Sequence, residues 1–123
     1  VTPDDANDKW YFKKTSVTNS SGDLIDAGDT YIDYTAKAVD ASTTVATGDK
    51  VKFIFIKNID STASIYIVLD AGTASSSVGD GITIGPNEFF CARLPNTTVA
   101  DIHAISSAST AEVLVCALLD DVG

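Results

Sequence analysis

The chain has 123 residues, 45% of them apolar and 20% charged, and its 17 acidic residues outnumber 8 basic ones to give a net charge of −9. These proportions are typical of one globular domain with its own core and exclude wholesale disorder. A surface this acidic repels phosphate backbones, so we expect no nucleic-acid partner. No apolar stretch reaches the ~20 residues of a membrane-spanning helix, so we expect no membrane partner.

The first third of the chain predicts two strands. Residues 1–8 are polar and contain a proline, which indicates a short flexible N-terminal arm, with one domain over residues 9–123. A first strand starts within residues 9–13, and residues 30–35 form the second. Residues 36–47 are rich in Ala, Ser and Thr and predict either a long loop or a weak edge strand.

The rest of the chain is a series of short apolar segments separated by Gly, Ser, Asp and Asn clusters. Each segment has the length of a strand and is rich in β-branched or aromatic residues. The segments are residues 51–56, 65–69, 82–84, 88–94, 101–105 and 113–119. Helical periodicity is nowhere sustained, although residues 98–106 allow one short helical turn. The sequence therefore predicts an all-β, single-domain β-sandwich or small barrel, jelly-roll or Greek-key-like.

The segment over residues 51–56 is apolar on both faces. Strict alternation puts Val51, Phe53 and Phe55 on one face, and Ile54 and Ile56 on the other. Two-sided hydrophobicity favours a central strand covered on both sides, or a strand with one face at a subunit contact.

Few residues have the pattern of a catalytic or metal site. His103 is the single histidine, and the sequence does not place Ser106 or Ser107 beside it as a triad would require. Two cysteines and one histidine far apart lack zinc-site spacing. The acidic turns at residues 23–29 and 70–72 raise the question of Ca²⁺, but both fit ordinary turn chemistry. We therefore predict no catalytic, cofactor-binding or metal-binding residues, and no enzyme.

Two further alternatives concern thiols and aromatic rings. Cys91 and Cys116 lie within strands, where two buried thiols are favoured over a disulfide. Aromatic side chains in strands more often fill cores, but they could also form a platform for stacking sugars. Those considered are Trp10, Tyr11, Tyr31, Tyr34 and Tyr66.

Several strand and turn segments carry a resemblance to known proteins. They are SIYIVLDAGTA at residues 64–74, ITIGPNE at 82–88, LPNTTVADIHAIS at 94–106 and LLDDV at 118–122. These segments resemble small virion proteins of tailed bacteriophages, especially marine ones. The opening KWYFKKTSVT at residues 9–18 is also similar to theirs. The match touches both ends of the chain and is weakest in its middle third. These residues are strand and turn formers, so no active site transfers with them.

The resemblance implies a non-enzymatic structural protein of a virus particle, assembled in the host cytoplasm. A small, acidic, all-β chain of this kind is similar to capsid decoration or cement proteins, which bind the outside of the major capsid lattice and stabilise it. The implied partners are the major capsid protein and further copies of the chain itself, with a homotrimer favoured. The alternative is a carbohydrate-binding or adhesion β-sandwich module, on a virion tail or surface or secreted.

Overall fold

The computed structural model describes residues 8–33, 38–77 and 79–120. Within these ranges the chain forms ten strands and one short 3₁₀ helix, η1, at Val99–Asp101. The strands are β1 (Asp8–Thr18), β2 (Gly22–Asp23), β3 (Thr30–Asp33), β4 (Ala38–Thr44), β5 (Lys50–Asn58), β6 (Ile65–Val68), β7 (Ile82–Ile84), β8 (Phe89–Arg93), β9 (His103–Ser106) and β10 (Thr110–Asp120). In this part of the chain, no helix is long and apolar enough to cross a membrane.

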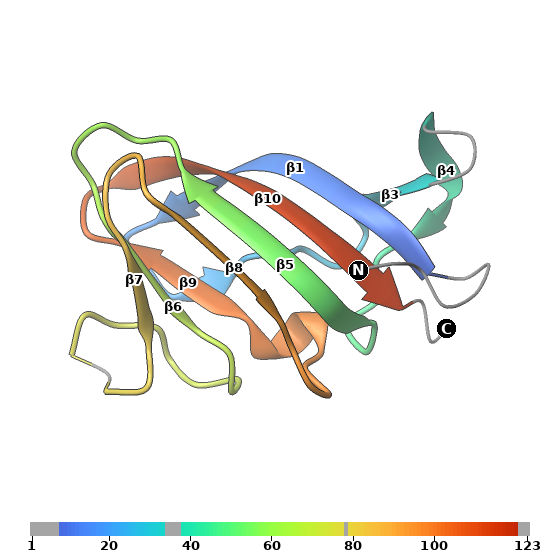
Figure 1. The fold of residues 1–123 in the computed structure, drawn as a ribbon. Coiled ribbons are helices and arrows are strands. Elements are labelled where there is room, and N and C mark those ends of the chain that lie inside the picture. The colour runs from blue at the N-terminus through green and yellow to red at the C-terminus, as the bar shows by residue number, and fades with distance from the viewer. Residues whose placement is uncertain (1–7, 34–37, 78, 121–123) are drawn as a thin grey trace.

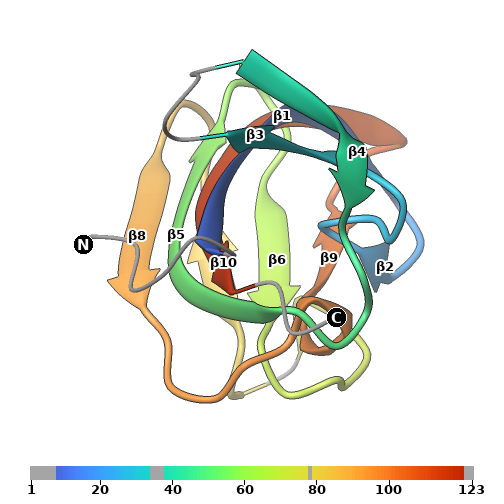
Figure 2. The ribbon, with the colours of Figure 1, turned by 90° about the vertical axis from the view of Figure 1, so that its right-hand side faces the viewer.

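The strands form two antiparallel sheets. The larger sheet has the order β4-β3-β1-β10-β5-β8, and the smaller one has the order β2-β9-β6-β7. The larger sheet curls around one side of the smaller one, so that the two enclose a core between them (Figures 1 and 2). The predicted all-β sandwich is confirmed.

The first and last strands pair in the middle of the larger sheet. β1 and β10 have eleven residues each and stay in register from Asp8 opposite Asp120 to Thr18 opposite Thr110. β5 then pairs with the other edge of β10. These three long strands form a continuous platform on which their own outward side chains have fixed positions.

The core lies between the sheets and is made almost entirely of aliphatic side chains. Ile54 and Ile56 on β5 and Ile65 and Ile67 on β6 are fully buried, as is Val115 on β10. Fully burying one such side chain contributes about 1.5–3 kcal/mol. The alternation that buries these residues leaves the intervening ones on the outside of each sheet.

The six apolar segments all form strands, with two differences in detail. The sequence pattern put Val51 on the face of Phe53 and Phe55, and this was wrong: Val51 is buried in the core. Leu118 of β10 pairs with Phe53, and the next residue, Leu119, pairs with Val51. Lys52 is therefore an extra residue in β5, a β-bulge, and it inverts the alternation of faces on its two sides.

The second difference lies at the last connection before β9. The expected strand at residues 101–105 begins at His103, because Asp101 closes the η1 turn. The Asp101 carboxylate accepts a hydrogen bond from the Thr98 N–H at 2.9 Å. The short helical turn expected within residues 98–106 is confirmed.

The structure decides between the loop and the edge strand considered for residues 36–47. Residues 36–47 contain an edge strand, β4, which pairs with β3. The expected N-terminal arm lies outside the described residues except for Asp8, which is the buried first residue of β1.

A tight turn connects β7 of the smaller sheet to β8 of the larger one. After β7, the Glu88 N–H donates to the Gly85 carbonyl at 3.1 Å, and Asn87 has a φ of 63°. This is the geometry of a type II turn, in which Pro86 presets the first central position. The predicted turn at residues 85–87 is confirmed.

Candidate functional site

His103 serves as a structural link. Its Nδ1 lies 2.7 Å from the Gly72 carbonyl oxygen, and its Nε2 lies 3.3 Å from Asp23 Oδ1. The ring therefore joins β9 to β2 and to the connection after β6. Ser106 points to the opposite face of β9 and is buried, where its hydroxyl accepts a hydrogen bond from the Ala108 N–H. His103 and Ser106 thus do not form a nucleophile–base pair.

The first acidic turn, at residues 23–29, also makes structural contacts. Asp29 accepts a hydrogen bond from the Tyr11 hydroxyl at 2.7 Å and one from Lys13 Nζ at 2.9 Å. Burial, together with this bond to the Asp29 carboxylate, raises the pKa of the Tyr11 hydroxyl. Among the described residues, no three or more His, Cys, Asp or Glu side chains are grouped to hold a metal ion.

The second acidic turn follows β6. The Gly72 N–H donates to Asp70 Oδ1 at 3.0 Å, and this bond leads the causes that lower the pKa of the Asp70 carboxyl. Ala71 has a φ of 65°. The arrangement is that of a turn closed by its own aspartate, as the sequence suggested.

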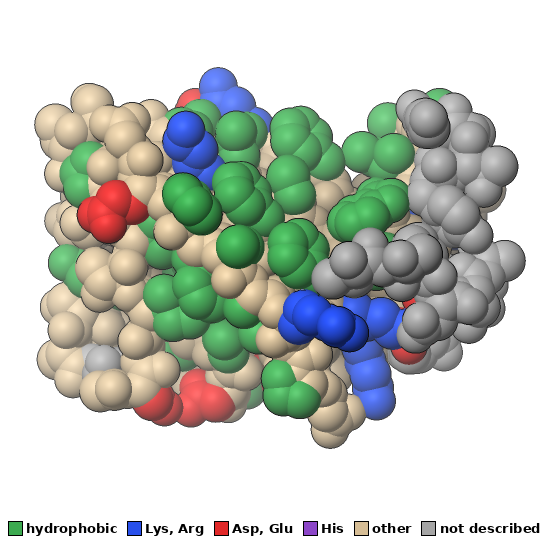
Figure 3. Space-filling model, in the orientation of Figure 1, with side chains coloured by type: hydrophobic (Ala, Val, Ile, Leu, Met, Phe, Trp, Pro, Cys, Tyr) green, Lys and Arg blue, Asp and Glu red, His purple; other side chains and the backbone are tan. Residues whose placement is uncertain are grey.

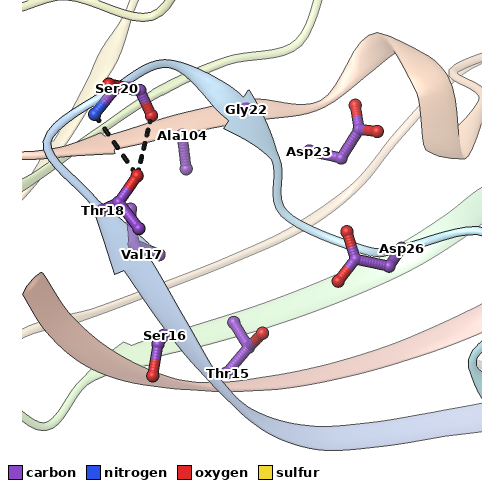
Figure 4. A pocket seen from close by; sticks show the side chains of 9 residues that line it. All are labelled: Thr15, Ser16, Val17, Thr18, Ser20, Gly22, Asp23, Asp26 and Ala104. Carbon is purple, nitrogen blue, oxygen red and sulfur yellow. Dashed lines mark hydrogen bonds between the residues drawn. The ribbon is translucent and has the colours of Figure 1, made fainter.

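A small open depression lies between β1 and β2. Its volume is about 160 Å³, below the several hundred cubic ångströms of most small-molecule sites. Hydroxyl groups line much of it, with Asp23 and Asp26 along one side (Figure 4). The hydroxyl of Thr18 hydrogen bonds to the backbone of Ser20. No aromatic side chain lines it, so it has no stacking surface for a sugar ring.

The aromatic residues considered for a sugar platform do not gather on one surface. Tyr11 and Tyr31 are buried in the core, and Tyr66 lies on the smaller sheet. Trp10 lies on the outward face of the larger sheet, and Tyr34 is outside the described residues.

The outward face of the larger sheet is the feature with the most functional potential. The register of β1, β10, β5 and β8 places its side chains in three rows, each crossing all four strands. The first row is Trp10, Leu118, Phe53 and Arg93. The second is Phe12, Cys116, Phe55 and Cys91. The third is Lys14, Leu114, Lys57 and Phe89. We call these twelve residues the outer face.

Nine of the twelve residues of the outer face are apolar, and several are open to solvent. Phe12 is 54% exposed and Phe89 is 64% exposed. The Phe89 ring stacks on Phe55 with centroids 5.7 Å apart. Figure 3 shows hydrophobic side chains gathered across the middle of this face, with Lys and Arg side chains at its borders. An apolar patch of this kind on a free surface is typical of an interaction site.

Both cysteines of the chain lie on the outer face, which corrects the expectation of two buried thiols. Cys91 is exposed, Cys116 is half-buried, and both are free. They lie on strands that flank β5 on opposite sides, so strand spacing puts their Cα atoms about 10 Å apart. A disulfide spans no more than ~7 Å between Cα atoms. The thiols therefore cannot pair within one chain.

Sequence patterns had identified part of this face. The two-sided segment at residues 51–56 contains Phe53 and Phe55, and it had suggested a subunit contact. The contributions of Phe12 and Phe89 were missed, because each lies in a segment whose alternation is incomplete. The signal that could have found them is the matching two-sided pattern of residues 113–119, since such a strand needs apolar neighbours on its outward side.

Comparisons with known proteins give limited help. No protein-family model matches the chain, and no curated protein matches it. Among solved structures, the chain is similar to the coat protein of Tobacco streak virus. The sequences are 11% identical, the match covers 100% of this chain and 92% of the virus protein, and the TM-score is 0.44. At so low an identity and TM-score, the coat protein provides no argument about what this chain does.

Proposed function

We propose that the chain is a non-enzymatic structural protein of a bacteriophage particle, a decoration protein that binds the outside of the major capsid lattice. The observation that carries this proposal is the outer face, where a rigid sheet presents apolar side chains in fixed positions. Such a surface suits assembly with other protein chains, further copies of this one included. It offers no enclosed cavity in which to hold a small substrate.

The place of the phage-like segments in the fold supports the proposal. Residues 64–74, 82–88 and 94–106 form most of the smaller sheet and the turns that hold it. They are joined by the bond between His103 and Gly72 and by the Ala71 N–H, which donates to the Asp101 carbonyl at 2.9 Å. The resemblance therefore rests on residues that fix the framework, as expected where related proteins share an architecture.

Net charge adds a further argument. A charge of −9 keeps a small protein soluble and away from polyanions, while apolar contacts remain available for docking. A lattice of identical sites lets a weak contact gain occupancy when the bound protein is itself oligomeric. The phage resemblance favoured a homotrimer, and the mass measurement described below distinguishes it from a dimer.

The test is electron cryomicroscopy of particles made with and without the gene. We expect density of this size on the outer capsid surface that disappears in the deletion particles. Identical capsids in the two preparations, or density confined to the tail or neck, would contradict the decoration role. A position for the gene beside those of the capsid and portal proteins would support a virion role in general.

A further inference from the structure

The outer face leaves the rings of Phe12 and Phe89 largely exposed, although Leu118 at its edge is buried within the chain. We infer that a second copy of this chain packs against it face to face, with the two sheets related by a two-fold axis parallel to the strands. In such a pair the second copy covers the outer face, so the dimer would meet a capsid with its remaining surface. The pairing can be measured on the purified protein whether or not the chain binds a capsid.

The size of the face suits a protein contact. Four strands 4.8 Å apart, with three rows of side chains about 6.6 Å apart along them, give roughly 400 Å² in projection. That lies within the range of the largest apolar patches on monomeric proteins, about 300–600 Å², which are often functional. The rings of Phe12 and Phe89 stand out from the sheet, and charged side chains extend the contact around it. A stable interface takes about 800 Å² of accessible surface from each partner, so the protruding rings and the charged border must contribute beyond the flat projection.

The charges on the face are compatible with self-pairing. The face has three cations, Lys14, Lys57 and Arg93, on a molecule whose net charge is −9. Lys14 is paired with Glu112 at 2.9 Å on the border of the face. In an isologous contact these cations meet the same face of the other copy, so their positions decide whether the pairing is repulsive.

A two-fold axis parallel to the strands and midway between β10 and β5 places β1 over β8 of the second copy, and β10 over β5. Each row then faces the same row of the second copy, with the order of its four residues reversed. Arg93 lies over Trp10, Lys14 lies over Phe89, and Lys57 lies over Leu114. No cation faces a cation, and two of the three lie over aromatic rings, which attract them.

The same axis matches large side chains with small ones. In the middle row, Phe12 lies over Cys91 of the second copy, and Phe55 lies over Cys116. Aligned sheets pack about 10 Å apart by interdigitation of their side chains. An axis across the strands would instead put each Phe of this row over itself and each Cys over itself. The along-strand axis is therefore the one that fits the row.

The test is sedimentation equilibrium under reducing conditions. We expect twice the chain mass of 12.8 kDa at concentrations of about 1–100 μM, the range in which interfaces of this size associate. Phe12→Lys, at an exposed position, should raise the dissociation constant at least tenfold. Thr83→Lys adds the same charge at an exposed position on the smaller sheet, and it should remain dimeric. Matching far-UV circular dichroism would show that both variants fold.

A charge pair tests the arrangement itself. Phe12 and Cys91 lie three strands apart within one chain, so opposite charges placed there can meet only between copies. The double variant Phe12→Lys with Cys91→Glu should therefore recover at least part of the dimerisation that Phe12→Lys loses. A wild-type protein of single mass throughout, a three-fold mass, an undisturbed Phe12→Lys dimer, or no recovery in the double variant would overturn the inferred pairing.

Discussion

Replacement of Asn58 tests how the framework of the smaller sheet is held to the larger one. Asn58 ends β5, and its side chain is fully buried. Its amide nitrogen lies 2.7 Å from the Ala63 carbonyl oxygen and 3.2 Å from those of Ile84 and Gly85. Its amide oxygen accepts the Asp60 N–H at 3.0 Å. One side chain thus fastens β5 to the loop before β6 and to the turn after β7.

The expected loss follows from the number of bonds. An amide group has two N–H protons, so two of the three carbonyls are served at a time, and the amide oxygen makes a third bond. Each bond contributes about 1 kcal/mol net, and each buried carbonyl left without a donor costs about 1–3 kcal/mol. Asn58→Ala should therefore lower the free energy of unfolding by about 3–5 kcal/mol. Asn58→Asp should lose more near neutral pH, because a carboxylate would face carbonyl oxygens.

Urea unfolding followed by Trp10 fluorescence and far-UV circular dichroism measures both losses. The midpoint should fall without a large change in slope, and the melting temperature should drop by roughly 10–20 °C. Asn19→Ala, at an exposed turn position, is the control and should change stability by less than about 0.5 kcal/mol. A loss below about 1 kcal/mol in Asn58→Ala would refute the role assigned to this side chain.

Three further predictions concern single side chains or turns. Burial and the Asp29 carboxylate raise the pKa of the Tyr11 hydroxyl, so on raising the pH this hydroxyl loses its proton in the unfolded chain before it does in the folded one. The free energy of unfolding should therefore fall by up to ~1.4 kcal/mol per pH unit above about pH 10. In urea titrations across that pH, the stability difference between wild type and Tyr11→Phe should shrink as the pH rises; a constant difference would contradict this. Gly28→Ala should cost about 1–2 kcal/mol because Gly28 has a φ of 93°, whereas Gly22→Ala should be nearly neutral by thermal unfolding. In dilute solution Cys91 should react with a thiol reagent before Cys116, whose pKa is raised by burial; simultaneous labelling would count against the exposures assigned to them.

The sequence was sufficient to predict strands in the six apolar segments because turn residues bound each of them closely, whereas the two-residue strand β2 lies where a turn was expected. The turn at residues 85–87 was readable because Pro86 and Asn87 favour one turn type. The position of Val51 was not readable, since the bulge that inverts it depends on where β10 places its register. Edge strand β4 was ambiguous for a similar reason: its pairing with β3 supplies what its weak apolar pattern lacks. Local sequence chemistry thus predicted where strands and turns lie, while the pairing between strands determined which side chains face the core.

The outer face depends on the same distinction. In an antiparallel sandwich, one face of each strand packs on the core, and the other is usually polar. β10 departs from this rule because Leu114, Cys116 and Leu118 lie on its outward side, between the aromatic rings of β1 and β5. A ring as exposed as that of Phe12 gains only part of its burial energy from folding, whereas covering the rest would stabilise an assembled state by roughly 25 cal/mol per Å². A chain that keeps both faces of β5 and β10 largely apolar is therefore best explained by a working form in which the second face is covered.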